Sequence, residues 1–190
     1  MIESLEPPGF NNRILICDDN KSIHDDLSKI FQPPPRSHNE GLIRSLEHQL
    51  FDNPEEVATA ERVRLNFQID SAFSSREAIK MTQQARREGF PYALIFMDVR
   101  MPPGDDGIKT IKQIWRTMPE TEMVLLTAYS DYSWEQIIAT LGINDKLLYL
   151  RKPFSSIAVK QIALNLINKW NSNEKLRQRI SELETRLQAS

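Results

Sequence analysis

Short apolar runs alternate with stretches of helical periodicity along most of this chain. The strongest run, 93–98, reads Ala-Leu-Ile-Phe-Met-Asp, and its lack of polar alternation predicts a strand buried on both faces. The segment 65–69 differs, because Leu65, Phe67 and Ile69 alternate with polar residues and predict a strand with one wet face. Further buried strands are predicted at 14–17, 123–127 and 146–150.

Residues with helical spacing separate these strands and predict the fold class. Five short strands alternating with helices are typical of an α/β protein with a parallel sheet covered on both faces. An amphipathic second strand belongs at a sheet edge, which favours the flavodoxin-like, doubly wound order 2-1-3-4-5. The helices are expected at 23–31, 75–89, 108–118, 133–142 and from 157 onward.

Composition changes the picture little. The 190 residues are 40% hydrophobic and carry a formal net charge of -2, so neither nucleic acid nor an acidic membrane surface is expected as a direct partner. The single cysteine, Cys17, fits a reducing compartment. No apolar run approaches the roughly 18 residues that span a bilayer, and the acidic N-terminus does not resemble an export signal. A cytoplasmic protein is therefore expected.

The polar segments divide the chain into three parts. Residues 1–12, with Pro7-Pro8-Gly9, are interpreted as a flexible lead-in. The main domain is expected to run from 13 to 170, with an irregular insertion at 32–62 that carries one or two short helices. Residues 171–190 are interpreted as a coiled-coil or signalling helix.

Polar side chains follow four of the five predicted strands at their carboxyl ends. Asp18 and Asp19 follow the first strand, Asp98 ends the third, Thr127 ends the fourth and Lys152 follows the fifth. In an open parallel sheet these ends share one rim, so the residues are predicted to converge. Three carboxylates without a His/Cys cluster suit Mg²⁺ (or Mn²⁺), and Asp98 is the best-placed nucleophile.

With these residues in order, the chain resembles the receiver domain of two-component response regulators, over about Arg13–Trp170. The resemblance implies that Asp98 is the phosphoacceptor and that Asp19 binds the metal directly, assisted by Asp18 through water and by the Arg100 backbone carbonyl. It implies that Lys152 is the conserved-type lysine of a cis Lys152-Pro153 pair. Thr127 and Tyr149 would be the switch residues. A histidine kinase or histidine phosphotransfer protein would be the donor, and the chain would catalyse only its own phosphoryl transfer and dephosphorylation.

Three features depart from the pattern of that family. The loop Met101–Gly107 is one residue longer than the usual Met-Pro-x-x-Asp-Gly, and the 32–62 insertion is atypical. Tyr129 and Arg100 occupy positions that in the family tune dephosphorylation. Together with the sequence at 127–134, these features resemble receivers at the front of multidomain bacterial signalling proteins.

The tail carries a short heptad pattern. Ile180 and Leu187 fall at a positions, and Leu176 and Leu183 at d positions. Asn173 falls at the preceding a position, where a buried polar pair favours a parallel, in-register homodimer. Arg179 at g and Glu184 at the following e carry opposite charges. A lone amphipathic helix that folds back on the domain is the alternative. We expect the native chain to continue past Ser190 into an output domain.

Each of these residues also has a plainer interpretation. Taken alone, Asp98 fits a loop or helix cap, and Asp18-Asp19 an N-terminal helix cap. His24, beside Asp25 and Asp26, is interpreted as part of a solvated helix face.

Two other function classes fit part of this pattern. A Mg²⁺-dependent phosphohydrolase of the haloacid-dehalogenase type needs a second Asp two residues after the nucleophile, where this chain has Arg100. A dimerisation module that works without phosphorylation is the other alternative.

Overall fold

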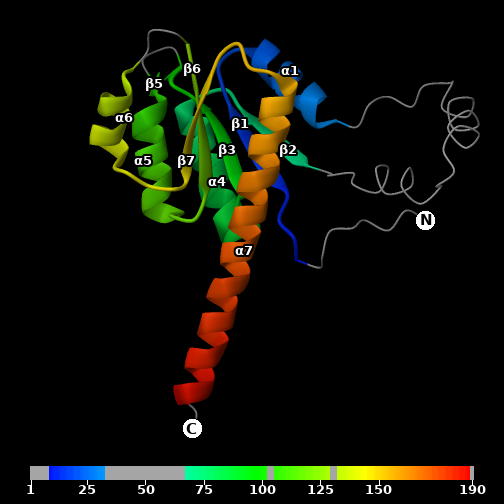
Figure 1. The fold of residues 1–190 in the computed structure, drawn as a ribbon, viewed down its shortest axis with the longest axis vertical. Coiled ribbons are helices and arrows are strands. Elements are labelled where there is room, and N and C mark those ends of the chain that lie inside the picture. The colour runs from blue at the N-terminus through cyan, green and yellow to red at the C-terminus, as the bar shows by residue number, and fades with distance from the viewer. Residues whose placement is uncertain (1–8, 33–66, 102–104, 129–131, 189–190) are drawn as a thin grey trace, which may run out of the picture.

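In the computed structural model of the protein, five parallel strands form the central sheet (Figure 1). The predicted order 2-1-3-4-5 is confirmed, with β2 at the edge. Residues 9–32, 67–101, 105–128 and 132–188 are described, so the insertion predicted at 32–62 lies almost wholly outside them. Across the sheet the strands are β2 (Gln68–Ala72), β1 (Arg13–Cys17), β3 (Leu94–Asp98), β6 (Glu122–Thr127) and β7 (Leu147–Arg151).

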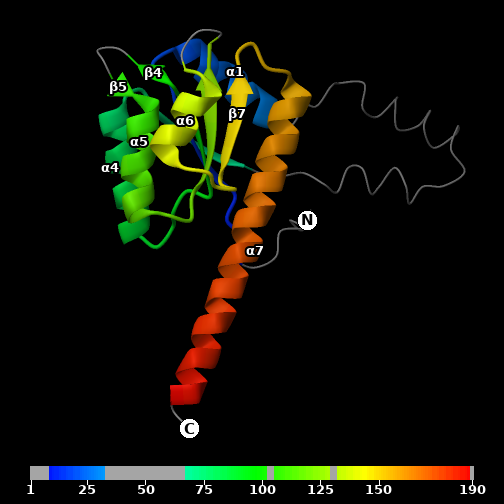
Figure 2. The ribbon, with the colours of Figure 1, turned by 60° about the vertical axis from the view of Figure 1, so that its left-hand side comes forward.

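Helices cover both faces of this sheet, as Figures 1 and 2 show from two sides. One layer holds α4 (Ser75–Arg87), α5 (Gly107–Thr117) and α6 (Trp134–Leu141), and the other holds α1 (Lys21–Phe31) and α7 (Ser156–Gln188). Helix α6 begins, as predicted, with Ser133 as its N-cap, and the Ser133 side chain forms a capping box with Gln136.

The two faces of β1 show how the sheet buries both of its sides. Ile14 and Ile16 pack in the cluster that faces α1 and α7, whereas Leu15 and Cys17 pack in the cluster that faces α4 and α5. Strand β3 is buried at every position, as predicted from its unbroken apolar run. These rigid central strands therefore fix where their carboxyl-terminal residues, Cys17 and Asp98, lie.

The loop after β3 contains a small antiparallel hairpin that the sequence did not predict. It pairs β4 (Arg100–Met101) with β5 (Asp105–Asp106) on either side of residues 102–104. The Gly107 N–H then donates to the Val99 carbonyl at 2.9 Å. A Cβ at Gly107 would lie 2.0 Å from the Asp98 carbonyl oxygen, so only glycine fits this close approach.

Helix α7 is one continuous helix of 33 residues, and it crosses the boundary predicted at 170/171 without a break. Its first half packs on the sheet through Val159, Ala163, Leu166, Ile167 and Trp170. Its second half extends beyond the domain (Figure 2). The domain boundary at 170/171 stays a prediction, because a continuous helix can join two units as well as belong to one.

Polar contacts hold α7 to the end of the sheet opposite the strands' carboxyl termini. Asn171 is buried and exchanges hydrogen bonds with the backbone of Asn11, which ties the last part of the predicted lead-in to the helix. Arg177 contacts Glu120 at 2.6 Å. Lys169 contacts the buried Glu122 at 3.3 Å, and burial raises the pKa of that carboxyl although the Lys169 charge opposes the rise.

Candidate functional site

Three carboxylates and one lysine meet at the carboxyl edge of the sheet. The register pairs Cys17 with Met97, so Asp18 and Asp98 are neighbours one residue further along β1 and β3. Carboxylate oxygens of Asp18, Asp19 and Asp98 all lie within 4.8 Å of one another. The Lys152 ammonium lies 2.6 Å from both Asp18 Oδ2 and Asp98 Oδ1. The predicted convergence of these residues is thus present in the structure.

Asp18 is the most firmly held member of this group. Its side chain is only 1% exposed, and Oδ2 accepts from Lys152 while Oδ1 accepts from the Asn20 N–H at 2.9 Å. Its own N–H donates to the Ala72 carbonyl at 3.2 Å, which extends the pairing of β1 with β2. Because the carboxylate is already engaged by protein donors, Asp18 is suited to an indirect role at a metal ion rather than a direct one.

The Asp98 carboxylate is buried, unlike an ordinary carboxylate in a loop. Oδ1 accepts from Lys152 and Oδ2 accepts from the Arg100 N–H at 3.0 Å. Burial raises the pKa of Asp98, although the Lys152 hydrogen bond and charge oppose the rise. Each oxygen of this buried carboxylate accepts one hydrogen bond and keeps a further lone pair for an electrophile or a cation.

Lys152 follows β7 and reaches back to both aspartates. The backbone N–H of Lys152 donates to the Thr127 carbonyl at 2.8 Å, and the Lys152-Pro153 peptide bond is cis, as predicted. Burial lowers the pKa of Lys152, but the hydrogen bonds and charges of Asp18 and Asp98 outweigh it, and the pKa is raised. Lys152 is therefore a charged ammonium group at neutral pH.

The predicted switch residues, Thr127 and Tyr149, are in contact with each other. Thr127 is fully buried at the end of β6, one residue beyond the position that pairs with Asp98. Its hydroxyl donates to the Tyr149 hydroxyl at 2.7 Å. Tyr149 is half-buried and packs against the cluster under α5 and α6. A shift of the Thr127 hydroxyl would therefore break or lengthen its hydrogen bond to Tyr149.

The donor set fits a small hard cation. Asp19 is exposed whereas Asp18 and Asp98 are buried, and each contributes a carboxylate oxygen to the group. Mg²⁺ takes oxygen ligands at about 2.1 Å and keeps several waters, so opposite ligands lie about 4.2 Å apart. Oxygens within 4.8 Å of one another suit an ion that binds some carboxylates directly and others through water.

Some predicted site residues are placed less completely. Arg100 is exposed on β4, and its role as a carbonyl ligand stays a prediction. Tyr129 lies outside the described residues. Along α7, Asn173 is half-buried, and the other seam residues are exposed: Leu176 61%, Ile180 56%, Leu183 45% and Leu187 78%.

The interpretation of His24 as part of a solvated helix face was wrong, because this side chain is 4% exposed. Asp25 and Asp26 are exposed as expected, and their charge masked the spacing that His24 shares with Leu27 and Phe31. Residues three and seven positions apart lie on one face of a helix, so that spacing could have placed His24 in the core. The constraint on Gly107 was also missed.

Comparison with known proteins identifies the family. The family model for the response regulator receiver domain matches residues 52–180, and the chain belongs to this family. The matched part does not include the first strand with Asp18 and Asp19, which the fold places between β2 and β3. The resemblance inferred from the sequence is thereby confirmed.

Individual relatives are more distant. The oxygen regulatory protein NreC of Staphylococcus carnosus is 31% identical over 80 residues, which cover 40% of this chain and 35% of that protein. The chain thus corresponds to little more than a third of that relative.

Two solved structures show the likeness of the fold alone. The adenylate cyclase structure from Rhodopirellula baltica has a TM-score of 0.61 at 19% identity, over 90% of this chain and 98% of that one. A CheY-like receiver from Methanospirillum hungatei has a TM-score of 0.55 at 16% identity, over 86% and 98%.

No helix among the described ranges is long and apolar enough to cross a membrane.

Proposed function

We propose that the chain is a phosphoacceptor receiver, in which Asp98 takes a phosphoryl group from a phosphohistidine donor and the resulting state alters the dimer and output. The observation that carries the proposal is the Lys152 ammonium 2.6 Å from both Asp18 and Asp98, beside the exposed Asp19 carboxylate. The donor would be a histidine kinase or a histidine phosphotransfer protein, and the chain would work with it in the cytoplasm.

In the proposed transfer, an Asp98 carboxylate oxygen attacks the phosphorus atom. The bond between phosphorus and the donor imidazole nitrogen breaks, and its electron pair stays on that nitrogen. The donor leaves as a neutral imidazole when its other ring nitrogen carries a proton. The product is an acyl phosphate on Asp98. Arg100 N–H, which donates to Oδ2, keeps the carboxylate plane fixed while the other oxygen reacts.

The charges around Asp98 suit this reaction. Asp18, Asp19 and Asp98 would hold Mg²⁺ (or Mn²⁺), which when bound neutralises phosphoryl oxygens. Lys152 offers a fixed ammonium group to a phosphoryl oxygen from the side of β7. Asp18, held by Asn20 and Lys152, keeps that ammonium group aimed at the reacting edge.

The contact between Thr127 and Tyr149 supports a switch. A hydroxyl group has one proton to donate, so Thr127 can donate either to Tyr149, as here, or to a phosphoryl oxygen on Asp98. Phosphorylation would favour the second arrangement and leave Tyr149 free to rotate. A larger fraction of the molecules would then have the surface formed by β6, α6, β7 and α7 in its active conformation.

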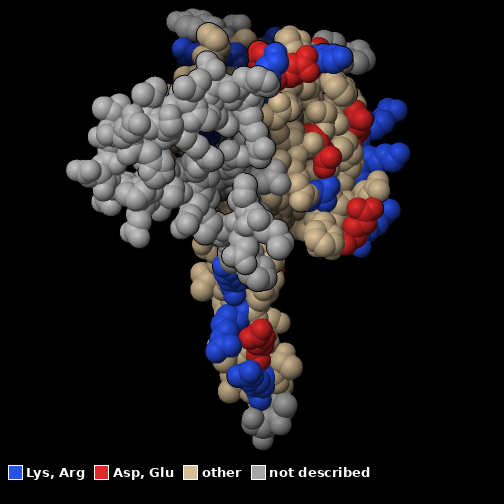
Figure 3. Space-filling view, turned by 90° about the vertical axis from the view of Figure 1, so that its right-hand side faces the viewer, with Lys and Arg blue, Asp and Glu red and all other residues tan. Residues whose placement is uncertain are grey.

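The second half of α7 is the proposed dimer contact. The exposed seam of Leu176, Ile180, Leu183 and Leu187 would pack against a second copy in parallel, with Asn173 paired to its counterpart. Arg179 contacts Glu182 of its own helix at 3.1 Å, and the pairing with Glu184 across the dimer stays a prediction. Acidic and basic side chains are mixed along the extended part of α7 (Figure 3).

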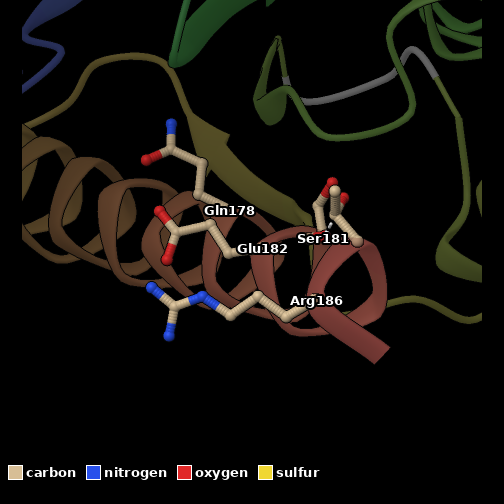
Figure 4. A pocket seen from close by; sticks show the side chains of 5 residues that line it. Gln178, Ser181, Glu182 and Arg186 are labelled. Carbon is tan, nitrogen blue, oxygen red and sulfur yellow. Dashed lines mark hydrogen bonds between the residues drawn. The ribbon is translucent and has the colours of Figure 1, made fainter. Parts of the chain in front are cut away.

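The opposite side of α7 is polar, which leaves the seam as its apolar face. The shallow hollow in Figure 4 is lined only by α7 residues at b, c, f and g positions of the heptad. They are Gln178, Ser181, Glu182, Thr185 and Arg186. This division into an apolar and a polar side suits a two-stranded coiled coil.

Replacing Ile180 by Asp should weaken the dimer at least about 100-fold, because two carboxylates would enter the seam at a cost of about 3 kcal/mol. The matched control is Ser181→Asp, one residue along on the polar side, which should leave the dimer unchanged. Sedimentation equilibrium of the phosphorylated and unphosphorylated protein measures both. Equal dimer dissociation constants for the two variants would contradict the assignment of the seam as the dimer contact.

The proposed phosphoacceptor function is tested by incubation with radiolabelled acetyl phosphate. The protein should take up label in Mg²⁺ and not in EDTA. Hydroxylamine should remove the label, because it cleaves acyl phosphates, and borohydride reduction should map it to Asp98. Label that survives hydroxylamine, or that maps to another residue, would contradict the proposal. Absence of label together with a stable dimer would favour the phosphorylation-independent module.

A further inference from the structure

His24 is a buried polar side chain for which the proposed chemistry has no direct use. It lies on α1, and its ring lies against that of Phe73, with centroids 4.3 Å apart and the ring planes tilted by 38°. Nε2 lies 2.7 Å from the backbone carbonyl oxygen of Asp18, and Nδ1 lies 2.9 Å from the Ser71 hydroxyl. One imidazole on α1 therefore contacts both β2 and Asp18, the residue that follows β1.

The partners fix the tautomer of a neutral His24 ring. A carbonyl oxygen only accepts hydrogen bonds, so Nε2 must carry the proton that is donated to Asp18. Nδ1 then accepts from the Ser71 hydroxyl, which can donate. The two hydrogen bonds are thus compatible with a single neutral form. A side chain with a donor at the Nε2 position would keep the contact with Asp18, and one without it would lose that contact.

With the hydrogen bond from His24, each polar atom of Asp18 has a protein partner. The Asp18 N–H is bound by Ala72, Oδ1 by Asn20 and Oδ2 by Lys152, and His24 binds the remaining polar atom, the carbonyl. That carbonyl belongs to the peptide group that joins Asp18 to Asp19. Its orientation therefore sets the direction in which the exposed Asp19 carboxylate leaves the chain.

We propose that His24 is a positioning residue, which holds the Asp18–Asp19 peptide so that the Asp19 carboxylate faces Asp98 and the pair binds a divalent cation. The inference rests on the proposed function, because it concerns the metal affinity of the same site. Loss of the Nε2 donor lets the peptide rotate, and metal affinity falls. Partners that orient ligands at metal sites typically contribute about 10- to 100-fold to affinity.

Two variants separate this role from core packing. In His24→Gln the side-chain amide nitrogen reaches the Nε2 position and can still donate to the Asp18 carbonyl. In His24→Asn the shorter amide reaches only the Nδ1 position beside Ser71. Ser71→Ala removes the other hydrogen bond and leaves the donor to Asp18 in place. All three changes perturb the same packed region, so a merely structural role predicts similar effects on metal binding once stability is matched.

The readout is Mn²⁺ binding, measured from the loss of the free-ion electron paramagnetic resonance signal, with urea unfolding of each variant beside it. His24→Asn should weaken Mn²⁺ binding at least about tenfold, while His24→Gln and Ser71→Ala stay within about threefold of the parent. Mn²⁺ affinity that tracks stability across the set, or that His24→Asn leaves unchanged, overturns the inference. A parent protein that binds no Mn²⁺ would instead count against the proposed function.

Discussion

The Asp98→Asn variant should take up no label from acetyl phosphate in Mg²⁺, at a detection limit of about 1% of the parent protein. An amide oxygen is too weak a nucleophile to replace the carboxylate, and an amide also removes one charged ligand from the metal site. Asn has the same shape, and its one amide oxygen can still accept from Lys152, but its amide nitrogen cannot accept from the Arg100 N–H, so one hydrogen bond is lost. The measurement is a time course of label per mole of protein.

The matched control for this variant is Asp26→Asn, since Asp26 is an exposed carboxylate on α1. It should label at the parent rate. Asp98→Asn that labels like Asp26→Asn would remove Asp98 from the proposed chemistry.

Stability should confirm that the lost labelling does not come from unfolding. Burial raises the pKa of Asp98, so the folded state binds a proton at a higher pH than the unfolded state does. Ionisation of Asp98 therefore reduces the free energy of unfolding as the pH rises toward neutrality. The Asn variant lacks this pH-dependent loss, although it also lacks the hydrogen bond from the Arg100 N–H. Its urea midpoint relative to that of the parent should therefore be higher at pH 7 than at a pH below the ordinary range of an Asp carboxyl.

Replacing Gly107 by Ala should lower the free energy of unfolding by about 3 kcal/mol or more. The added Cβ would lie 2.0 Å from the Asp98 carbonyl oxygen and 2.9 Å from its carbon, and both are backbone atoms. No rotamer change can relieve such a contact, so α5 or the end of β3 must move. Because the displaced peptide carries the proposed phosphoacceptor, labelling of Asp98 should also fall. Urea unfolding followed by circular dichroism measures the loss of stability.

Gly89→Ala is the control for this change. Gly89 has φ of 77°, and nothing lies within 4 Å of the position of its missing Cβ, so alanine there meets backbone strain without a collision. That strain is worth about 1 kcal/mol. A Gly107→Ala protein as stable as the Gly89→Ala protein would show that the loop adjusts freely, against the packing described above.

The parts of the fold that the sequence predicted are those set by local patterns. The unbroken apolar run predicted β3 as a central strand, because a strand buried on both faces has no polar alternation. The alternation at 65–69 predicted an edge strand correctly, but β2 begins three residues later than predicted, at Gln68. The convergence of Asp18, Asp98 and Lys152 followed from strand order alone, since parallel strands end at one edge. Periodicity and topology were sufficient for the rim of the site.

What the sequence did not reveal depends on backbone positions and on contacts across elements. The hairpin of β4 and β5 is held by main-chain pairing of two-residue strands, which leaves no hydrophobic pattern. The collision at Gly107 concerns a carbonyl oxygen, and no side chain marks it. His24 was assigned to solvent because of its acidic neighbours, although its partners come from β1 and β2.

Because α7 is continuous, the number of residues between two positions determines the angle between their side chains around the helix axis. Each residue turns an α-helix by about 100°, so Trp170, which packs on the sheet, and Asn173 differ in direction by about 60°. The seam therefore runs beside the domain-facing stripe and not beneath it. One extra residue between them would swing the seam by about 100° around the helix axis, and seven extra residues would bring it back to within about 20° of its present azimuth.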